Sequence, residues 1–125
     1  MKSLKSYIQE KLVIKKNKYK YFPKTKEELR EIIEKRIKDE GNEVNLNDID
    51  TSKITDMSEL FVEIDFDGDI SGWDVSKVKN MSFMFAWCED FNQDISNWDV
   101  SNVKKINNIF DYCSIEEKHK PQFSV

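Results

Sequence analysis

The chain has 125 residues, of which 38% are hydrophobic, 12% aromatic and 35% charged, and its formal net charge is -4. This length suits one domain with a modest core, and eight Phe with three Trp exclude a disordered chain. No apolar run approaches the roughly 20 residues of a membrane span, and the start lacks the core of a signal peptide, so we expect a cytoplasmic protein without membrane contact.

Charge is distributed unevenly along the chain. Residues 1–40 hold 13 Lys/Arg against 7 Asp/Glu, whereas residues 41–125 hold 7 against 17. A basic amino-terminal segment therefore precedes an acidic body, and an acidic body repels nucleic-acid phosphates and anionic membranes. We expect a protein partner with a basic surface, and no direct contact with nucleic acid.

The clearest helix signal lies at residues 25–41, after a segment with two alternatives: a short helix within 3–12 or a β-hairpin over 11–22. Thr25 with Glu28 fits a capping box, and Gly41 suits the helix end. One face is apolar, formed by Leu29, Ile32, Ile33 and Ile37. Because an array of repeats exposes its core at an open end, we expect this helix to be an amino-terminal cap.

The rest of the chain is repetitive. Residues 66–90 (FDGDISGWDVSKVKNMSFMFAWCED) and 91–115 (FNQDISNWDVSNVKKINNIFDYCSI) are identical at 12 of 25 positions, and residues 46–61 form a weaker copy of 70–85. A period of 20 to 29 residues is typical of leucine-rich-repeat solenoids. Stacked units of this kind bury one continuous core.

These units predict an α/β solenoid of three leucine-rich-repeat-type coils with an amino-terminal capping helix. We expect short parallel strands and short helices in each unit, the strands at 44–46, 69–71 and 94–96 and the helices at 79–87 and 104–112. The predicted division of the chain is a basic segment with the capping helix at 1–41, the three units at 42–115, and a polar tail at 116–125.

The stretch DFDGDISGWDVS (65–76) first suggests a calcium loop. Counted from Asp65, however, glycine stands at position 4 and Ser76 at position 12, where an EF-hand needs glycine at 6 and glutamate at 12. We therefore expect no metal. The repeated aspartates are read instead as acceptors for backbone N–H groups in turns, namely Asp69, Asp74, Asp94 and Asp99.

The aromatic residues divide into two groups. Trp73 and Trp98 recur at an apolar rung and are expected in the core. Trp87 and Tyr112 end the unit helices, where an outward position would suit a binding contact. With the acidic side of the array, they give the candidate partner-binding residues Asp67, Asp69, Asp74, Trp87, Asp94, Asp99 and Tyr112.

No catalytic or cofactor motif is found, so we expect neither an enzyme nor a cofactor. Cys88 and Cys113 occupy equivalent positions in adjacent units, a separation that suits a disulfide, but we expect two free thiols.

The units at 44–113 resemble the BspA-like leucine-rich repeat proteins, whose typical unit reads F-N-x-D-I-S-N-W-D-V-S-N-V-x-N-M-x-x-M-F. The resemblance implies a right-handed solenoid and a binding role. Our first hypothesis is a non-catalytic protein-interaction module, which could form homodimers through exposed solenoid ends. The alternatives are a phage-type, anti-CRISPR-like inhibitor of a host defence nuclease, acting by steric block or acidic mimicry, and a fragment of a surface adhesin.

Overall fold

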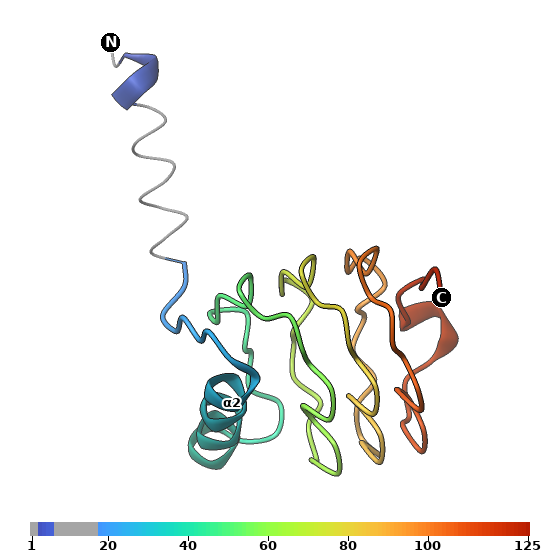
Figure 1. Ribbon diagram of the computed structural model, residues 1–125. Helices are drawn as coiled ribbons and strands as arrows, with labels where there is room; N and C mark the ends of the chain where they lie inside the picture. Colours follow the sequence, from blue (N-terminus) through green and yellow to red (C-terminus); the bar gives the residue numbers. More distant parts are fainter. Residues whose placement is uncertain (1–2, 7–17) are drawn as a thin grey trace.

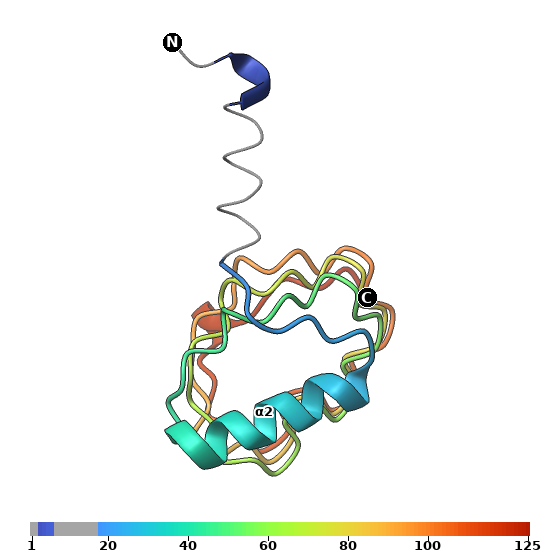
Figure 2. The same ribbon diagram turned by 90° about the vertical axis from the view of Figure 1, so that its left-hand side faces the viewer.

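The computed structural model of the chain describes residues 3–6 and 18–125. Two helices have both ends within these residues: the α-helix α2 (Lys26–Glu40) and the 3₁₀ helix η1 (Glu117–His119). Between them the chain winds into a stack of coils, with α2 at one end and the carboxyl terminus at the other (Figure 1). Seen along the stack, the coils superpose as one ring, and α2 forms a side of that ring (Figure 2).

Most of the residues for which a helix or a β-hairpin was expected before residue 23 lie outside the described part of the chain. None of the helices within the described part has the length and hydrophobicity needed to cross a bilayer.

The predicted helix is present as α2, and it begins and ends as its capping residues indicate. The hydroxyl of Thr25 accepts the N–H of Glu28 at 3.2 Å, and the Glu28 carboxylate accepts the N–H of Lys24 at 2.9 Å. Gly41 has a φ of 96°, which suits glycine, and donates its N–H to the carbonyl of Ile37. The apolar face packs on the core through buried Leu29 and Ile33 and partly buried Ile32 and Ile37.

α2 covers the first coil through polar contacts at its amino-terminal half. Lys26 Nζ lies 3.3 Å from the Asp56 carboxylate and donates to the Ser58 hydroxyl at 3.0 Å. The guanidinium of Arg30 donates to the carbonyl of Glu59 at 3.0 Å. The helix thus shields the core from water at this end of the stack.

Backbone hydrogen bonds join neighbouring coils in rows. Alternate N–H groups of one coil donate to carbonyl oxygens of the next at 2.8–3.0 Å, namely those of Met57, Glu59, Phe61 and Glu63 in one row and Met81, Phe83, Phe85 and Trp87 in the next. The intervening N–H groups close turns within the same coil, as from Leu60 to the Met57 carbonyl. Each such segment is therefore neither a β-strand nor an α-helix.

The predicted α/β solenoid is wrong in its elements. Among the described residues, parallel pairing is limited to isolated bridges, which join Tyr21 to Ile49, Asp56 to Asn80, and Asn80 to Lys105. The helices expected at 79–87 and 104–112 are runs of turns. Left-handed residues recur within them and in the first coil, namely Glu59, Glu63, Phe83, Trp87, Asn108 and Tyr112, with φ between 53° and 62°. Such residues interrupt an α-helix, because a right-handed helix requires negative φ.

The segments expected as strands curl because aspartate side chains bind the local backbone. Each carboxylate accepts the N–H of the serine two residues later at 2.9–3.1 Å, in the pairs Asp69–Ser71, Asp74–Ser76, Asp94–Ser96 and Asp99–Ser101. The prediction that these aspartates serve turns is confirmed, and the same turns remove the strands that a leucine-rich-repeat coil requires.

These turns should make stability depend on pH. Hydrogen bonds from Ser76, first from its hydroxyl and then from its N–H, lower the pKa of Asp74 in the folded protein. The stabilisation is therefore present above the unfolded pKa of about 4 and is lost as pH falls through the folded value. We expect Asp74→Ala to lower the free energy of unfolding by about 1 kcal/mol at pH 7, and by less at pH 3, in urea titrations.

Asp74→Asn is the matched control, because asparagine keeps the acceptor oxygen but carries no charge. It should retain most of the stability at pH 7 and lose the part of the pH dependence that Asp74 supplies. Equal stability of wild type and Asp74→Ala at pH 7 would show that this turn does not need its side-chain acceptor.

The core consists of side-chain ladders that run along the stack. The rings of Phe61, Phe85 and Phe110 stack at centroid distances of 5.4 and 5.7 Å. Trp73 and Trp98 stack at 6.4 Å, and each indole donates its Nε1–H to a carbonyl of the preceding coil at 2.9–3.0 Å. Both tryptophans are at most 5% exposed, so their predicted place in the core is confirmed.

The tail closes one side of the last coil. Ile95 donates its N–H to the carbonyl of His119 at 3.0 Å, and the Asn92 side chain accepts the N–H of Glu116 at 2.9 Å. Ile115 is buried beneath these contacts. The imidazole of His119 lies partly buried, with Nδ1 2.9 Å from the Asn92 side-chain oxygen.

Candidate functional site

One side of the stack carries large side chains that the core does not use. We call it the turn face, formed by the outward-pointing side chains of residues 58–63, 82–87 and 107–112. All six left-handed residues lie on it, and all six are exposed. On the turn face, equivalent positions of the three units can therefore carry different residues without altering the buried ladders.

Exposed aromatic rings gather on the turn face. Trp87 and Tyr112 stack with ring centroids 4.0 Å apart and planes 17° apart, although they are 48% and 68% exposed. Phe83, four residues before Trp87, is 41% exposed. Clustered exposed aromatics are informative, because a folded chain gains little stability from them and binding surfaces are enriched in them.

An acidic hollow of about 470 Å³ adjoins the pair of rings. It is lined by Glu63, Asp65, Trp87 and Glu89. No ion pair or hydrogen bond joins any of these three carboxylates to another side chain in the described part of the chain. Carboxylates beside the face of an indole suit a cationic group such as a lysine or arginine side chain.

The predicted aspartates lie apart from the aromatic pair. Asp69 and Asp94 line a second hollow of about 410 Å³ that contains neither Trp87 nor Tyr112. Asp67 joins two coils, since its carboxylate accepts the N–H of Asn92 at 2.9 Å and the side-chain amide of Gln93 at 3.0 Å. Asp74 and Asp99 accept from their own serines. All five therefore have structural roles, and the candidate residues do not form one site.

Serine hydrogen bonds also keep the turn aspartates ionised. The N–H of Ser71 lowers the pKa of Asp69, and the hydroxyls of Ser96 and Ser101 do the same for Asp94 and Asp99. These carboxylates add negative charge to the surface, but their hydrogen-bonded oxygens are already occupied.

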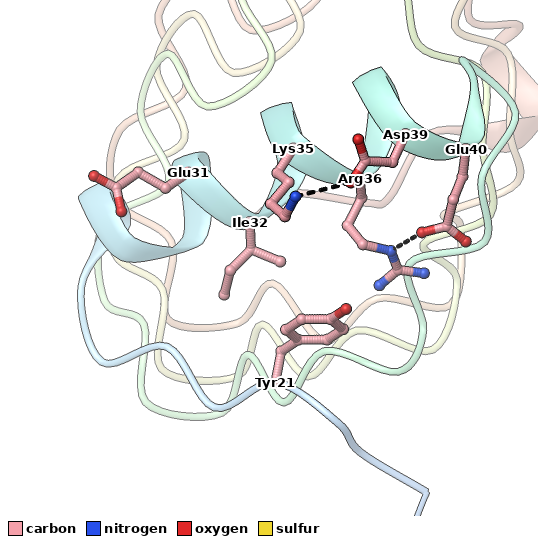
Figure 3. Close-up of a pocket in the computed structure, with 7 residues that line it drawn as sticks. All are labelled: Tyr21, Glu31, Ile32, Lys35, Arg36, Asp39 and Glu40. Carbon is pink, nitrogen blue, oxygen red and sulfur yellow. Dashed lines mark hydrogen bonds and ion pairs between the residues drawn. The ribbon is translucent and has the colours of Figure 1, made fainter.

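A third hollow, of about 290 Å³, lies between α2 and the side chain of Tyr21 (Figure 3). Four of its five charged side chains are paired: Lys35 bonds Asp39 at 2.9 Å, and Arg36 bonds Glu40 as well as Asp48 outside the hollow, the latter at 2.9 Å. Burial opposes the charged form of Arg36, but the hydrogen bonds to the carboxylates outweigh it and raise its pKa. Because the guanidinium also lies 5.0 Å from the centre of the Tyr21 ring, we interpret this hollow as part of the cap.

The cysteines offer no reactive centre on this surface. Both are free thiols; Cys88 is buried, and burial raises its pKa to about 12. Burial also raises the pKa of partly exposed Cys113. Within residues 3–6 and 18–125, no group of three or more His, Cys, Asp or Glu side chains is placed to hold a metal ion.

The exposure of Phe83 was not predicted from the sequence, because Phe83 was placed within an expected helix. A comparison of the units could have revealed it, since the equivalent residues in the other two units are the polar Glu59 and Asn108. A large apolar residue that breaks a polar ladder lies on the surface more readily than in the core.

The model of a protein family described as "Mycoplasma protein of unknown function, DUF285" matches residues 28–122, and the chain therefore belongs to this family. The match covers α2 except for its first two residues, the stacked units and η1. Neither a curated protein nor a solved structure matches the chain.

Proposed function

We propose that this member of the DUF285 family is a non-catalytic binding module that takes a protein partner on its turn face. Trp87 and Tyr112 would form the centre of the contact, and Glu63, Asp65 and Glu89 would receive basic side chains of the partner. The observation that carries the proposal is the exposed, stacked Trp87–Tyr112 pair.

Stability alone gives little reason for aromatic residues at these two positions. A non-glycine residue in the left-handed region costs about 1–2 kcal/mol, and the first unit has Glu63 at the same place. Stacking holds each ring against its neighbour before any partner arrives. Rigid aromatic groups of this kind lose little side-chain entropy on binding and commonly dominate interface energies.

The charge of the body favours a basic partner. Residues 41–125 carry 17 Asp/Glu against 7 Lys/Arg, which attracts a cationic surface and accelerates its approach. Two features of different origin, ring exposure and charge, thus favour the same class of function.

The test is affinity capture from the native cell with four forms of the tagged chain. These are wild type, Trp87→Ala/Tyr112→Ala, Asp65→Asn/Glu89→Gln, and the control Asp94→Asn/Asp99→Asn, which changes charge elsewhere and keeps the turn acceptors. We expect one stoichiometric basic protein with wild type and the control. The variant Trp87→Ala/Tyr112→Ala lacks the aromatic rings at the centre of the interface, and it should bind the captured protein about 10-fold more weakly, or weaker still.

The affinity of the captured protein should then be measured by calorimetry against each variant. Unchanged affinity in the aromatic variant would exclude the turn face, and equal weakening by the Asp94/Asp99 control would indicate general charge attraction. A captured nuclease whose activity falls on binding would identify the module as an inhibitor.

A further inference from the structure

The last coil ends in an unpaired row of backbone donors. In the two preceding coils, four alternate N–H groups donate to the next coil. Their equivalents in the last coil, the N–H groups of Ile106, Asn108, Phe110 and Tyr112, have no acceptor among the described residues. We call the backbone of residues 105–112 the open edge; it lies at the end of the stack opposite α2 (Figure 1).

The tail does not pair with the open edge. Its backbone contact with the last coil is made on the other side of the ring, where the His119 carbonyl accepts the N–H of Ile95. Over the open edge, Lys120 Nζ lies 5.3 Å from the centre of the Phe110 ring. Phe110 remains partly exposed, whereas its equivalent Phe85 is fully buried.

The chemistry of the open edge is one-sided, because its carbonyl oxygens are already engaged. The carbonyls of Lys105, Asn107, Ile109 and Asp111 accept from the preceding coil at 2.8–3.0 Å. Those of Ile106, Asn108 and Phe110 accept from turns within the last coil. The edge therefore presents donors, and whatever pairs with it must bring acceptors.

A second copy of the chain cannot supply those acceptors by simple end-to-end contact. Two open edges facing each other would oppose donors to donors. The acceptor row at the other end belongs to residues 56–62, and α2 covers that coil through Lys26 and Arg30. The homodimer expected from exposed ends is therefore disfavoured at both ends.

We propose that the open edge docks a segment of a partner protein that adopts the same run of turns, so that its alternate carbonyl oxygens accept the four free N–H groups. The template is the chain itself, where the same row of donors from Met81 to Trp87 binds alternate carbonyls at 2.8–3.0 Å. It is comparable to the addition of a strand at a sheet edge, a common mode of peptide recognition, with a run of turns in place of the strand. The site shares residues 107–112 with the turn face, but it includes none of the residues that line the acidic hollow.

The side chains around the open edge define the segment. Ile106 and Phe110 end two apolar ladders and are only partly buried, so the segment should place apolar side chains over them. Lys104 and Lys105 are exposed here, and their ammonium groups have no ion-pair partner among the described residues. Lys120, which lies over Phe110, is already paired with Glu117 at 2.6 Å. The exposed carboxylate on the edge, that of Asp111, accepts from the Asn108 side chain. An acidic segment with spaced apolar residues therefore fits better than a basic one.

The test follows amide exchange by NMR in the full chain, with a synthetic peptide as probe. The peptide copies residues 104–113, whose carbonyl row is already known to fit, with serine for the cysteine and glutamate for both lysines. In the free protein, the amides of Ile106, Asn108, Phe110 and Tyr112 should exchange far faster than those of Met81, Phe83, Phe85 and Trp87. Saturating peptide should slow the four edge amides, while a scrambled peptide should not.

A backbone variant removes one of the four donors. Joining residues 1–87 to a synthetic 88–125 at Cys88 allows an ester oxygen to replace the N–H of Phe110, and the peptide should then bind roughly fivefold more weakly. The same replacement at exposed Gln122 is the control.

Four results would overturn the proposal. Edge amides that exchange slowly in the free chain would show that the edge is already paired, and no slowing at saturating peptide would show that it does not dock such a segment. Slowing that depends on protein concentration alone would identify a second copy as the occupant. Equal slowing by inorganic phosphate would identify an anion site.

Discussion

Replacing Phe85 by alanine should lower the free energy of unfolding by about 4 kcal/mol, the largest effect that we expect from a single truncation. Phe85 is fully buried in the middle of the stack. Its ring lies 4.4 Å from that of Phe91, 5.4 Å from Phe61 and 5.7 Å from Phe110, so its loss breaks contacts in three coils. Since a domain of this size is stabilised by only about 5–15 kcal/mol, the variant should be close to unfolding.

Phe83→Ala is the matched control, because the same residue type is removed two positions earlier. Phe83 is 41% exposed on the turn face, and its truncation should change stability by less than about 0.5 kcal/mol. Urea titrations followed by tryptophan fluorescence would measure both variants. Similar losses for the two would mean that the ring of Phe85 is not the centre of the stack.

The helix and the ladders could be predicted because each depends on residues close together or on exact repetition. α2 is bounded by Thr25 and Gly41, whose capping chemistry acts within one turn of chain. Trp73 and Trp98 were placed in the core because they recur with the unit, and stacking requires equivalent residues to overlap. Both kinds of information are present in a single sequence.

The form of each coil could not be predicted, because the apolar spacing fits two backbones. Val78, Met81, Met84 and Phe85 point inward in the structure, as they would in a helix. The difference lies in Phe83 and Trp87, which adopt positive φ although neither residue type favours it. The cause is non-local: their N–H groups pair with the next coil, and this pairing outweighs local preference.

The candidate site could be predicted only in part, because the sequence shows the position of a residue in its unit but not the hydrogen bonds of its side chain. Trp87 and Tyr112 were distinguished from the core tryptophans by position in the unit. The carboxylates were assigned by charge alone, which does not reveal that Asp67 joins two coils while Asp65 has no such contact. Charge locates the acidic side of the array, but only hydrogen bonding separates structural carboxylates from available ones.

Replacing Gly68 by alanine should lower the free energy of unfolding by roughly 3 kcal/mol, because the added Cβ has no space. It would lie 2.0 Å from the carbonyl oxygen of Val44 and 2.6 Å from a ring carbon of Phe66. The carbonyl belongs to the preceding coil, and the Phe66 ring is held by stacking on Phe61 at 4.8 Å. Neither neighbour can move without disturbing the junction between the first two coils.

The other two glycines provide a graded comparison. A Cβ at Gly72 would meet the Asn47 side-chain oxygen at 3.0 Å, a group that can shift, so Gly72→Ala should cost less than about 1 kcal/mol. Gly41 has open space but a φ of 96°, and alanine there should cost about 1 kcal/mol through backbone strain alone. Thermal and urea unfolding of the three variants would rank them. If Gly68→Ala were no worse than Gly72→Ala, the coils would be separable at this point, and the stack would be held by its ladders rather than by close backbone contact.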